Sequence, residues 1–141
     1  MRAIQKIIKN RKGVCFAYLY GSFAEGKRFE DIDLALAPEK KITEKTKGRL
    51  IAKIEKELAG LKIKAPRTES TFEFGFWDLH WLDELPLPIQ YRVMQEGKLV
   101  CERHPQSRLQ WETKTMREYL DFEPFYHRVM YKAMEKMSQK L

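Results

Sequence analysis

Two aspartates, Asp31 and Asp33, stand one residue apart in DIDLALA, a stretch that otherwise has the pattern of a β-strand. Aspartate is disfavoured in strands, and an extended chain directs residues i and i+2 to the same face. The alternation therefore gives an acidic face and an apolar face, the latter carried by Ile32, Leu34 and Leu36. Two neighbouring carboxylates repel each other unless a positive group lies between them. We expect the apolar face to enter the core and the acidic face to meet solvent or a metal ion.

A buried strand is predicted directly upstream, where VCFAYLY (14–20) ends at Gly21 and Ser22. Glycine lets the backbone approach a ligand closely, and a turn after a strand offers N–H groups and a hydroxyl to a phosphate. Lys27 and Arg28 add positive charge nearby. Alone, each element is more often an ordinary turn or a solvated strand edge. Because Mg²⁺ binds carboxylates and substrate phosphates together, the combination predicts a phosphate cradle beside a metal-binding acid pair.

The remaining segments alternate between helical and extended patterns. Apolar periodicity and capping residues predict helices at 2–11, 43–59 with Thr43 as N-cap, 86–97, and about 106–138 with a break at Pro124. Alternation or apolar runs predict further strands at 61–64, 72–82 and 98–102. This order indicates an α+β (α/β mixed) fold, a small mixed sheet flanked by helices, in a single domain over residues 1–141.

Composition limits the classes of partner. The net charge of +7 suits phosphate-bearing ligands, nucleic acid or an acidic protein. Because the positive charge is spread along the chain, a solvated surface is favoured over a dedicated nucleic-acid groove. No apolar run approaches the roughly 18 residues that a membrane span needs, and the N-terminus lacks the apolar region of a secretory signal. Cys15 and Cys101 form no CxxC motif, so we expect free thiols in a reducing cytoplasm.

The run YGSFAEGKRFEDIDLA (20–35) resembles the signature of the DNA polymerase β-like nucleotidyltransferase superfamily. It is most similar to the minimal nucleotidyltransferases (MNT), with which it shares Gly21, Ser22, Ala24 and Gly26. The resemblance continues through FWDLHWL, LPLPIQYRVM and EGKLVCE to the helical tail, and so covers most of the chain. The spacer is slightly shorter than in the commoner minimal form. Glu30 replaces its usual serine and Glu25 its usual basic residue, which leaves the phosphate contacts of this loop open.

The resemblance implies a third acid on a later strand, and Asp78 is the natural candidate. In the predicted strand 72–82 it shares a face with His80 and is flanked by bulky apolar residues. These neighbours disfavour a role as a merely solvent-exposed acid. Glu73 and Asp83 are the alternatives. For His80 itself, packing or surface exposure is favoured over a role in the site.

A polymerase β-like fold with a C-terminal helix and a two-metal reaction are also implied by the resemblance. Two Mg²⁺ ions held by Asp31, Asp33 and Asp78 would bind ATP, with Gly21 and Ser22 at its phosphates. An acceptor hydroxyl would attack the α-phosphate, AMP would be transferred, and pyrophosphate would leave.

The acceptor is implied by the resemblance alone. Many minimal nucleotidyltransferases are encoded with a HEPN-domain toxin and act as antitoxins that transfer AMP to one of its tyrosines. A HEPN toxin is therefore the expected partner, and the lack of a second domain for tRNA, an antibiotic or a primer supports a protein acceptor. A non-catalytic antitoxin that acts by binding, and an RNA-modifying transferase, stay as alternatives.

Several points stay open in the sequence. They are the nucleobase, whether a homo-oligomer forms, and the role of an aromatic and methionine patch near the C-terminus. This patch either docks on the domain or faces a partner. It is formed by Phe122, Phe125, Tyr126, Met130, Met134 and Met137.

Overall fold

The computed structural model describes residues 2–21, 24, 31–61 and 77–139. Within this part of the chain, four strands form one sheet in the order β3-β2-β1-β4. Their bounds are Val14–Tyr20 for β1, Ile32–Pro38 for β2, Trp77–Trp81 for β3 and Lys98–Glu102 for β4. β1 pairs antiparallel with β2 and β4, whereas β2 and β3 run parallel, so the sheet is mixed, as the sequence predicts.

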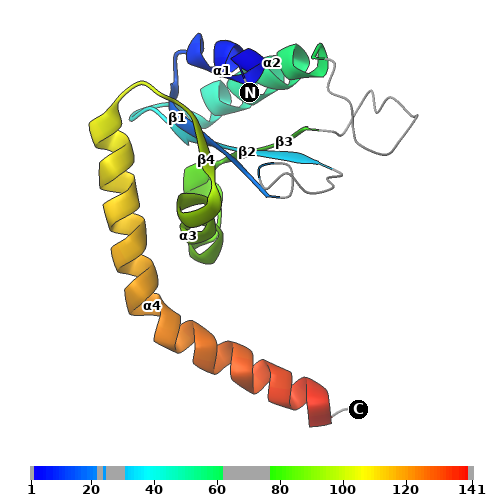
Figure 1. Ribbon diagram of the computed structural model, residues 1–141, viewed down its shortest axis with the longest axis vertical. Coiled ribbons are helices and arrows are strands. Elements are labelled where there is room, and N and C mark those ends of the chain that lie inside the picture. The colour runs from blue at the N-terminus through cyan, green and yellow to red at the C-terminus, as the bar shows by residue number, and fades with distance from the viewer. Residues whose placement is uncertain (1, 22–23, 25–30, 62–76, 140–141) are drawn as a thin grey trace, which may run out of the picture.

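Helices cover the two faces of this sheet unequally (Figure 1). One face is covered by α1 (Arg2–Lys9) and α2 (Glu44–Ala59), and the other by α3 (Leu87–Glu96). A short 3₁₀ helix, η1 (Leu82–Glu84), joins β3 to α3. The long α4 (Pro105–Gln139) packs on α3 and β1 with its first half and then leaves the sheet. The fold is thus α+β with a C-terminal helix, as expected.

The larger part of the core lies between the sheet and the α1/α2 layer. It is formed by aliphatic side chains that alternate along the strands and recur at helical spacing, because periods of two and of 3.6 residues each present one apolar face. The fully buried members include Ile4, Ile8, Leu19, Ile32, Leu34, Leu36, Ile54 and Leu58. A smaller cluster on the opposite face joins Phe16, Tyr18, Leu82 and Val93, with Trp111 of α4 packed against it.

Helix α2 begins as predicted, because the Thr43 side chain accepts a hydrogen bond from the Thr46 backbone N–H at 3.2 Å. Lys47 lies on the apolar stripe of this helix and is buried. Its ammonium donates to Asp83 at 3.1 Å and lies 5.6 Å from the centroid of the Trp81 ring. The charge is therefore paired inside the layer that α2 forms on β3 and η1.

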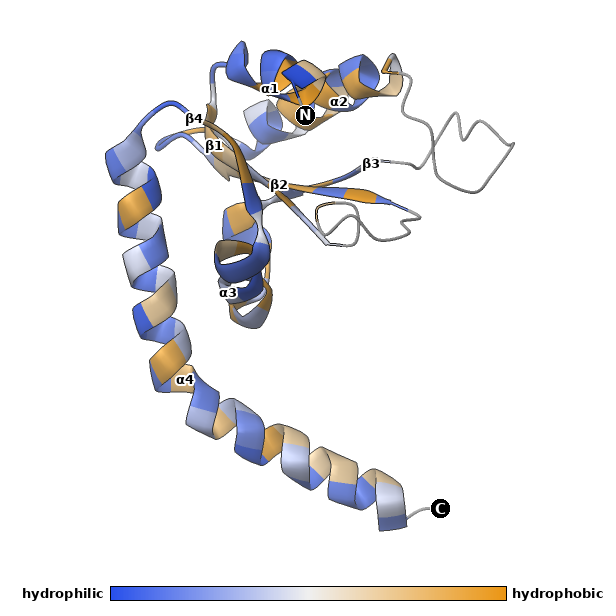
Figure 2. Ribbon diagram, viewed as in Figure 1, coloured by the Kyte–Doolittle hydropathy of each residue, from blue (hydrophilic) through white to orange (hydrophobic). Residues whose placement is uncertain are grey.

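Helix α4 contains Pro124 and continues through it, so the break expected there does not occur. A proline inside a helix removes one hydrogen bond and crowds the preceding turn, which bends a helix without ending it when both flanks are helical. The helix changes direction along its length (Figure 1). Beyond the bend, apolar residues still recur along it (Figure 2). Phe125, Met134 and Met137 are 57%, 63% and 70% exposed.

The other described boundaries agree with the predictions to within about two residues. The predicted strand residues 62–64 and 72–76 lie outside the described residues. The first helix ends at Lys9, where residue 10 forms a turn. Cys15 and Cys101 are free, as expected. In the described segments, no helix is both long enough and apolar enough to cross a membrane.

Candidate active site

Two of the three predicted acids meet on neighbouring strands. Asp33 of β2 and Asp78 of β3 are direct partners in the parallel register, between Ile32–Trp77 and Leu34–Leu79. Residues at one level of a parallel pair point to the same face. The flanking apolar residues enter the core under α1 and α2. The two carboxylates therefore lie together on the α3 side of the sheet, as the sequence predicts.

Asp33 is the electrostatically perturbed member of the pair. Burial, the negative charge of Asp78, a hydrogen bond with the Asp78 side chain and the charge of Asp31 together raise the pKa of Asp33 to about 6. These causes all disfavour the ionised form. The folded chain thus holds two facing carboxylates, and a positive group between them would offset their repulsion.

Gly21 makes room for Asp33. Its φ is +80°, in the left-handed region that favours glycine. A Cβ at this position would lie 2.5 Å from Oδ2 of Asp33, so any side chain would collide with the carboxylate. The last rung of the β1–β2 ladder joins Tyr20 to Asp33, which places the glycine turn directly beside the acid pair.

Tyr20 also borders the pair. Burial, followed by the charges of Asp33 and Asp78, raises the pKa of Tyr20 to about 12. Its phenol therefore keeps its proton at neutral pH next to the acids. From the sequence, this tyrosine is expected only as part of an apolar strand, although its place immediately before Gly21 is a signal of a position in the site.

Asp31 departs from its expected place. It lies in a bend immediately before β2, which begins one residue later than predicted, and it is exposed. In the described residues, no group of three or more His, Cys, Asp or Glu forms a ready-made metal cluster. The acid pair is preformed, and Asp31 is only close enough to affect its charge.

The other predicted residues fall into two groups. Ser22 and Glu73 lie outside the described residues. Asp83, an alternative to Asp78, accepts a hydrogen bond from Lys47 and belongs to the α2 side of the structure. Its placement favours Asp78 as the third acid.

His80 is half-exposed, as the favoured surface position predicts, and it also lies beside the acids. Its Nε2 is 2.9 Å from Oδ1 of Asp78, and its charge acts on Asp33. Within β3 it follows Asp78 by two residues and therefore shares its face. That spacing is visible in the sequence.

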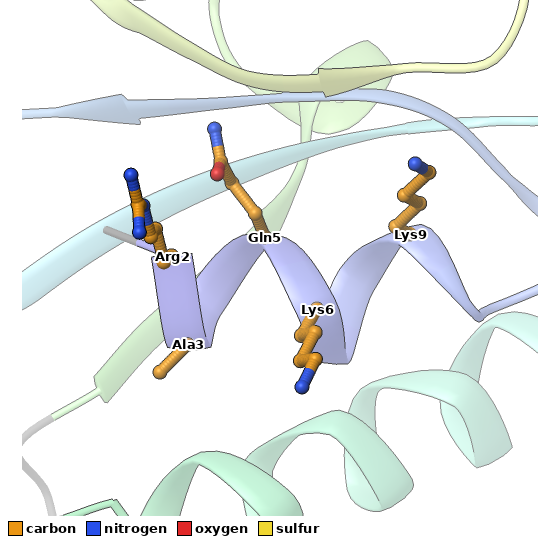
Figure 3. A pocket seen from close by; sticks show the side chains of 5 residues that line it. All are labelled: Arg2, Ala3, Gln5, Lys6 and Lys9. Carbon is orange, nitrogen blue, oxygen red and sulfur yellow. The ribbon is translucent and has the colours of Figure 1, made fainter.

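A separate hollow borders α1 and is no part of this site (Figure 3). It is lined by Arg2, Ala3, Gln5, Lys6 and Lys9. Lys6 points away from Arg2, Gln5 and Lys9, so the cations do not converge on one ligand. The helix α1 covers the sheet face opposite the acids.

Chains of known structure share this arrangement of elements. A chain in the crystal structure of a toxin–antitoxin with AMP-PNP superposes with a TM-score of 0.68 at 19% identity, covering 94% of this chain and 97% of that one. A chain in the structure of the tri-AMPylated Shewanella oneidensis HEPN toxin in complex with MNT antitoxin gives 0.64 at 20% identity, covering 94% and 97%. One from the MntA-HepT toxin-antitoxin gives 0.63 at 16% identity, covering 95% and 99%. At these identities the likeness shows the fold.

Sequence comparison extends the likeness from fold to family. No curated protein matches the sequence. A family model described as polymerase beta, nucleotidyltransferase matches residues 2–106, about three quarters of the chain. The match includes the glycine turn and the strands that bring Asp33 and Asp78 together. This match agrees with the acid pair and with the sheet that supports it. The chain therefore belongs to the polymerase beta nucleotidyltransferase family.

Proposed function

We propose that this chain is a Mg²⁺-dependent nucleotidyltransferase that moves AMP from ATP to a tyrosine hydroxyl of a HEPN toxin and thereby acts as its antitoxin. The single observation that carries the catalytic part is the registered pair of Asp33 and Asp78 on the α3 side of the sheet. The partner and the acceptor are supported by the likeness to structures of HEPN toxins with MNT antitoxins, one of them AMPylated.

The residues present fit Mg²⁺. Carboxylate oxygens are the hard donors that Mg²⁺ prefers. The pKa of Asp33 is raised because burial and the facing negative charge disfavour its ionised form, and a bound cation would offset both effects. We assign Asp33 and Asp78 as protein ligands, with Asp31 joining from the bend before β2. When bound, divalent ions would stabilise the charge that develops on the attacking and leaving oxygens.

The chain's own groups then divide the remaining work. Gly21, which has no side chain to fill the space beside Asp33, leaves the backbone accessible, and with Ser22 it is assigned to the phosphates of ATP. Tyr20, which keeps its proton at neutral pH, borders the site next to the acids. Asp78 orients the acceptor hydroxyl, whose oxygen bonds to the α-phosphorus as the bond to pyrophosphate breaks and the hydroxyl proton is released.

The second half of α4 supports a protein partner. The helix face that docks in its first half includes Trp111, Thr115 and Tyr119, the last stacked on Tyr91 at 3.9 Å. At the same helical spacing this face continues into Phe122 and beyond Pro124. There the apolar side chains are exposed, and exposed apolar surface of this extent marks interaction sites. We assign this surface, which includes Phe125, Val129, Met130, Met134 and Met137, to the toxin.

This surface also supports one alternative, an antitoxin that neutralises its toxin by binding alone. In that case the acid pair would be dispensable. Under either mechanism, the free thiols of Cys15 and Cys101 agree with a toxin and antitoxin that act in the reducing cytoplasm.

The test is transfer of label from α-³²P-ATP with Mg²⁺ to the HEPN protein encoded beside this chain. We expect label on the toxin and none with an Asp31→Asn, Asp33→Asn variant. Asp121→Asn, on an exposed position of α4, is the matched control and should retain transfer. Toxin neutralisation without label would favour the binding-only antitoxin, and label on RNA would favour the RNA-modifying transferase. Transfer that survives in the double variant would overturn the proposed mechanism.

A further inference from the structure

His80 is the side chain next to the acid pair to which neither the family motif nor the proposed chemistry gives a task. It lies one level beyond Asp78 on the same face of β3, and its strand partner on β2 is Ala35. Ala35 is small and fully buried. The His80 side chain is 40% exposed, which is more than a core histidine would be. Packing therefore does not account for its position.

The contact with Asp78 has a defined chemical sense. Nε2 of His80 and Oδ1 of Asp78 are 2.9 Å apart, the distance of a charge-assisted hydrogen bond. A carboxylate oxygen can only accept, so the contact is attractive when Nε2 carries the hydrogen. One oxygen of Asp78 is thus held by His80, and the other is left for Asp33 and for a cation.

Such a bond has consequences for a carboxylate with few other restraints. The Asp78 side chain is 47% exposed, so packing alone does not fix its rotamer. Groups that hydrogen-bond a metal ligand orient it, and their removal typically costs 10–100-fold in metal affinity or activity. A carboxylate that must serve a cation in one orientation gains most from such a partner.

We propose that His80 is a positioning residue that fixes the orientation of the Asp78 carboxylate for divalent-cation binding through the contact of its Nε2 with Oδ1. This inference rests on the proposed function, because it assumes that the acid pair takes a cation. It adds a determinant of cation affinity that lies outside the Gly-Ser and Asp-x-Asp motif.

The experiment uses the full chain and Mn²⁺ as probe, with free Mn²⁺ measured by electron paramagnetic resonance in the presence of AMP-PNP. His80→Gln retains an N–H donor, whereas His80→Met has nearly the same length and no donor. We expect about 10–100-fold weaker Mn²⁺ binding for His80→Met and near-normal binding for His80→Gln. In transfer assays, the Mg²⁺ concentration for half-maximal rate should rise in parallel, while the rate at saturating Mg²⁺ changes less.

Two controls separate the possible failures. His127 contacts Glu123 at 3.2 Å on α4, so His127→Met removes a similar pair away from the acids and should leave Mn²⁺ binding unchanged. Asp33→Asn should abolish tight binding; if it does not, the proposed function fails. If Asp33→Asn weakens binding but His80→Met binds Mn²⁺ like the wild type, only the role of His80 is overturned. Should His80→Met not fold, as judged by circular dichroism, His80→Leu takes its place.

Discussion

The two faces of the sheet use the same strands for different purposes. Toward α1 and α2, β2 presents Ile32, Leu34 and Leu36, all fully buried. Toward α3, the same strand presents Asp33 next to small alanines, and β3 adds Asp78 and a half-exposed histidine. Because a strand alternates with period two, one face can supply burial free energy while the other holds groups that burial disfavours. The adjacent residues Asp33 and Leu34 represent this division in its simplest form.

The largest expected effect is on activity at the polar face. Asp33→Asn removes a charge on which the proposed transfer depends, and we expect the rate to fall about a thousandfold, equivalent to roughly 4 kcal/mol of barrier. Label transfer to the toxin under single-turnover conditions measures it. Leu34→Ala, one residue away on the other face, should retain transfer at temperatures where it is folded. Equal losses in both variants would mean that the two faces are not separable.

The next effect is on stability at the apolar face. Leu34 is fully buried between β1, β3 and the α1/α2 layer. Truncation to alanine leaves a cavity and should lower the free energy of unfolding by about 2–5 kcal/mol. Urea denaturation followed by circular dichroism measures this loss. Leu120→Ala, at an exposed position of α4, is the control and should change stability little. A loss below about 1 kcal/mol for Leu34→Ala would show that this layer is loosely packed.

A third prediction concerns stability at the polar face, and its sign is opposite. Because the folded chain raises the pKa of Asp33 to about 6, its ionised form opposes folding at pH 7. Asp33→Asn should therefore stabilise the protein, by about 1–2 kcal/mol after allowance for solvent screening of a partly exposed group. The difference should shrink as the pH falls through about 6, where folded Asp33 takes up its proton, and should be small at pH 4, near the ordinary aspartate value. Thermal unfolding at pH 7 and pH 4, without divalent ions, tests the prediction. Destabilisation at pH 7 would show that the carboxylate is well accommodated without a cation.

Strand periodicity in the sequence places Asp33 and Asp78 each opposite apolar neighbours, and the family resemblance selects Asp78 as the third acid. The parallel register that pairs the two residues is not visible in the sequence, because it depends on how β2 and β3 align. Asp31 lies one residue before the observed strand, because a pattern of alternation does not fix the residue at which ladder pairing begins.

Other features were not predictable because they depend on long-range contacts. The burial of Lys47 on the apolar stripe of α2 depends on its partners Asp83 and Glu84, which lie 36 and 37 residues away. Pro124 indicated a break, but the sequence shows neither how strongly the flanking turns hold nor which direction the bent helix takes. The sequence left the role of the aromatic and methionine patch open for the same reason, because its docking depends on contacts with α3 and β1.

The smallest expected effect tests how α4 is held on the polar face. The Tyr18 hydroxyl donates to Oε1 of Glu112 at 2.6 Å, and Arg108 donates to the same oxygen at 2.8 Å. Tyr18→Phe keeps the ring packed between Phe16 and Trp111 but removes this bond, so we expect a loss of about 1 kcal/mol at neutral pH. Tyr131→Phe, which removes an exposed hydroxyl from the far half of α4, is the control.

The pH dependence of this loss distinguishes the hydrogen bond from a packing change. Burial and the bond to Glu112 raise the pKa of Tyr18 to about 12, above its ordinary value of 10. The stabilisation is therefore complete below pH 10 and is lost as the pH rises through about 12, so wild type and Tyr18→Phe should converge over this interval. Urea titrations at pH 8 and at steps up to pH 11 measure the convergence. A constant difference would assign the loss to packing, and the α4 face would then be held, like the α1/α2 face, by apolar contact alone.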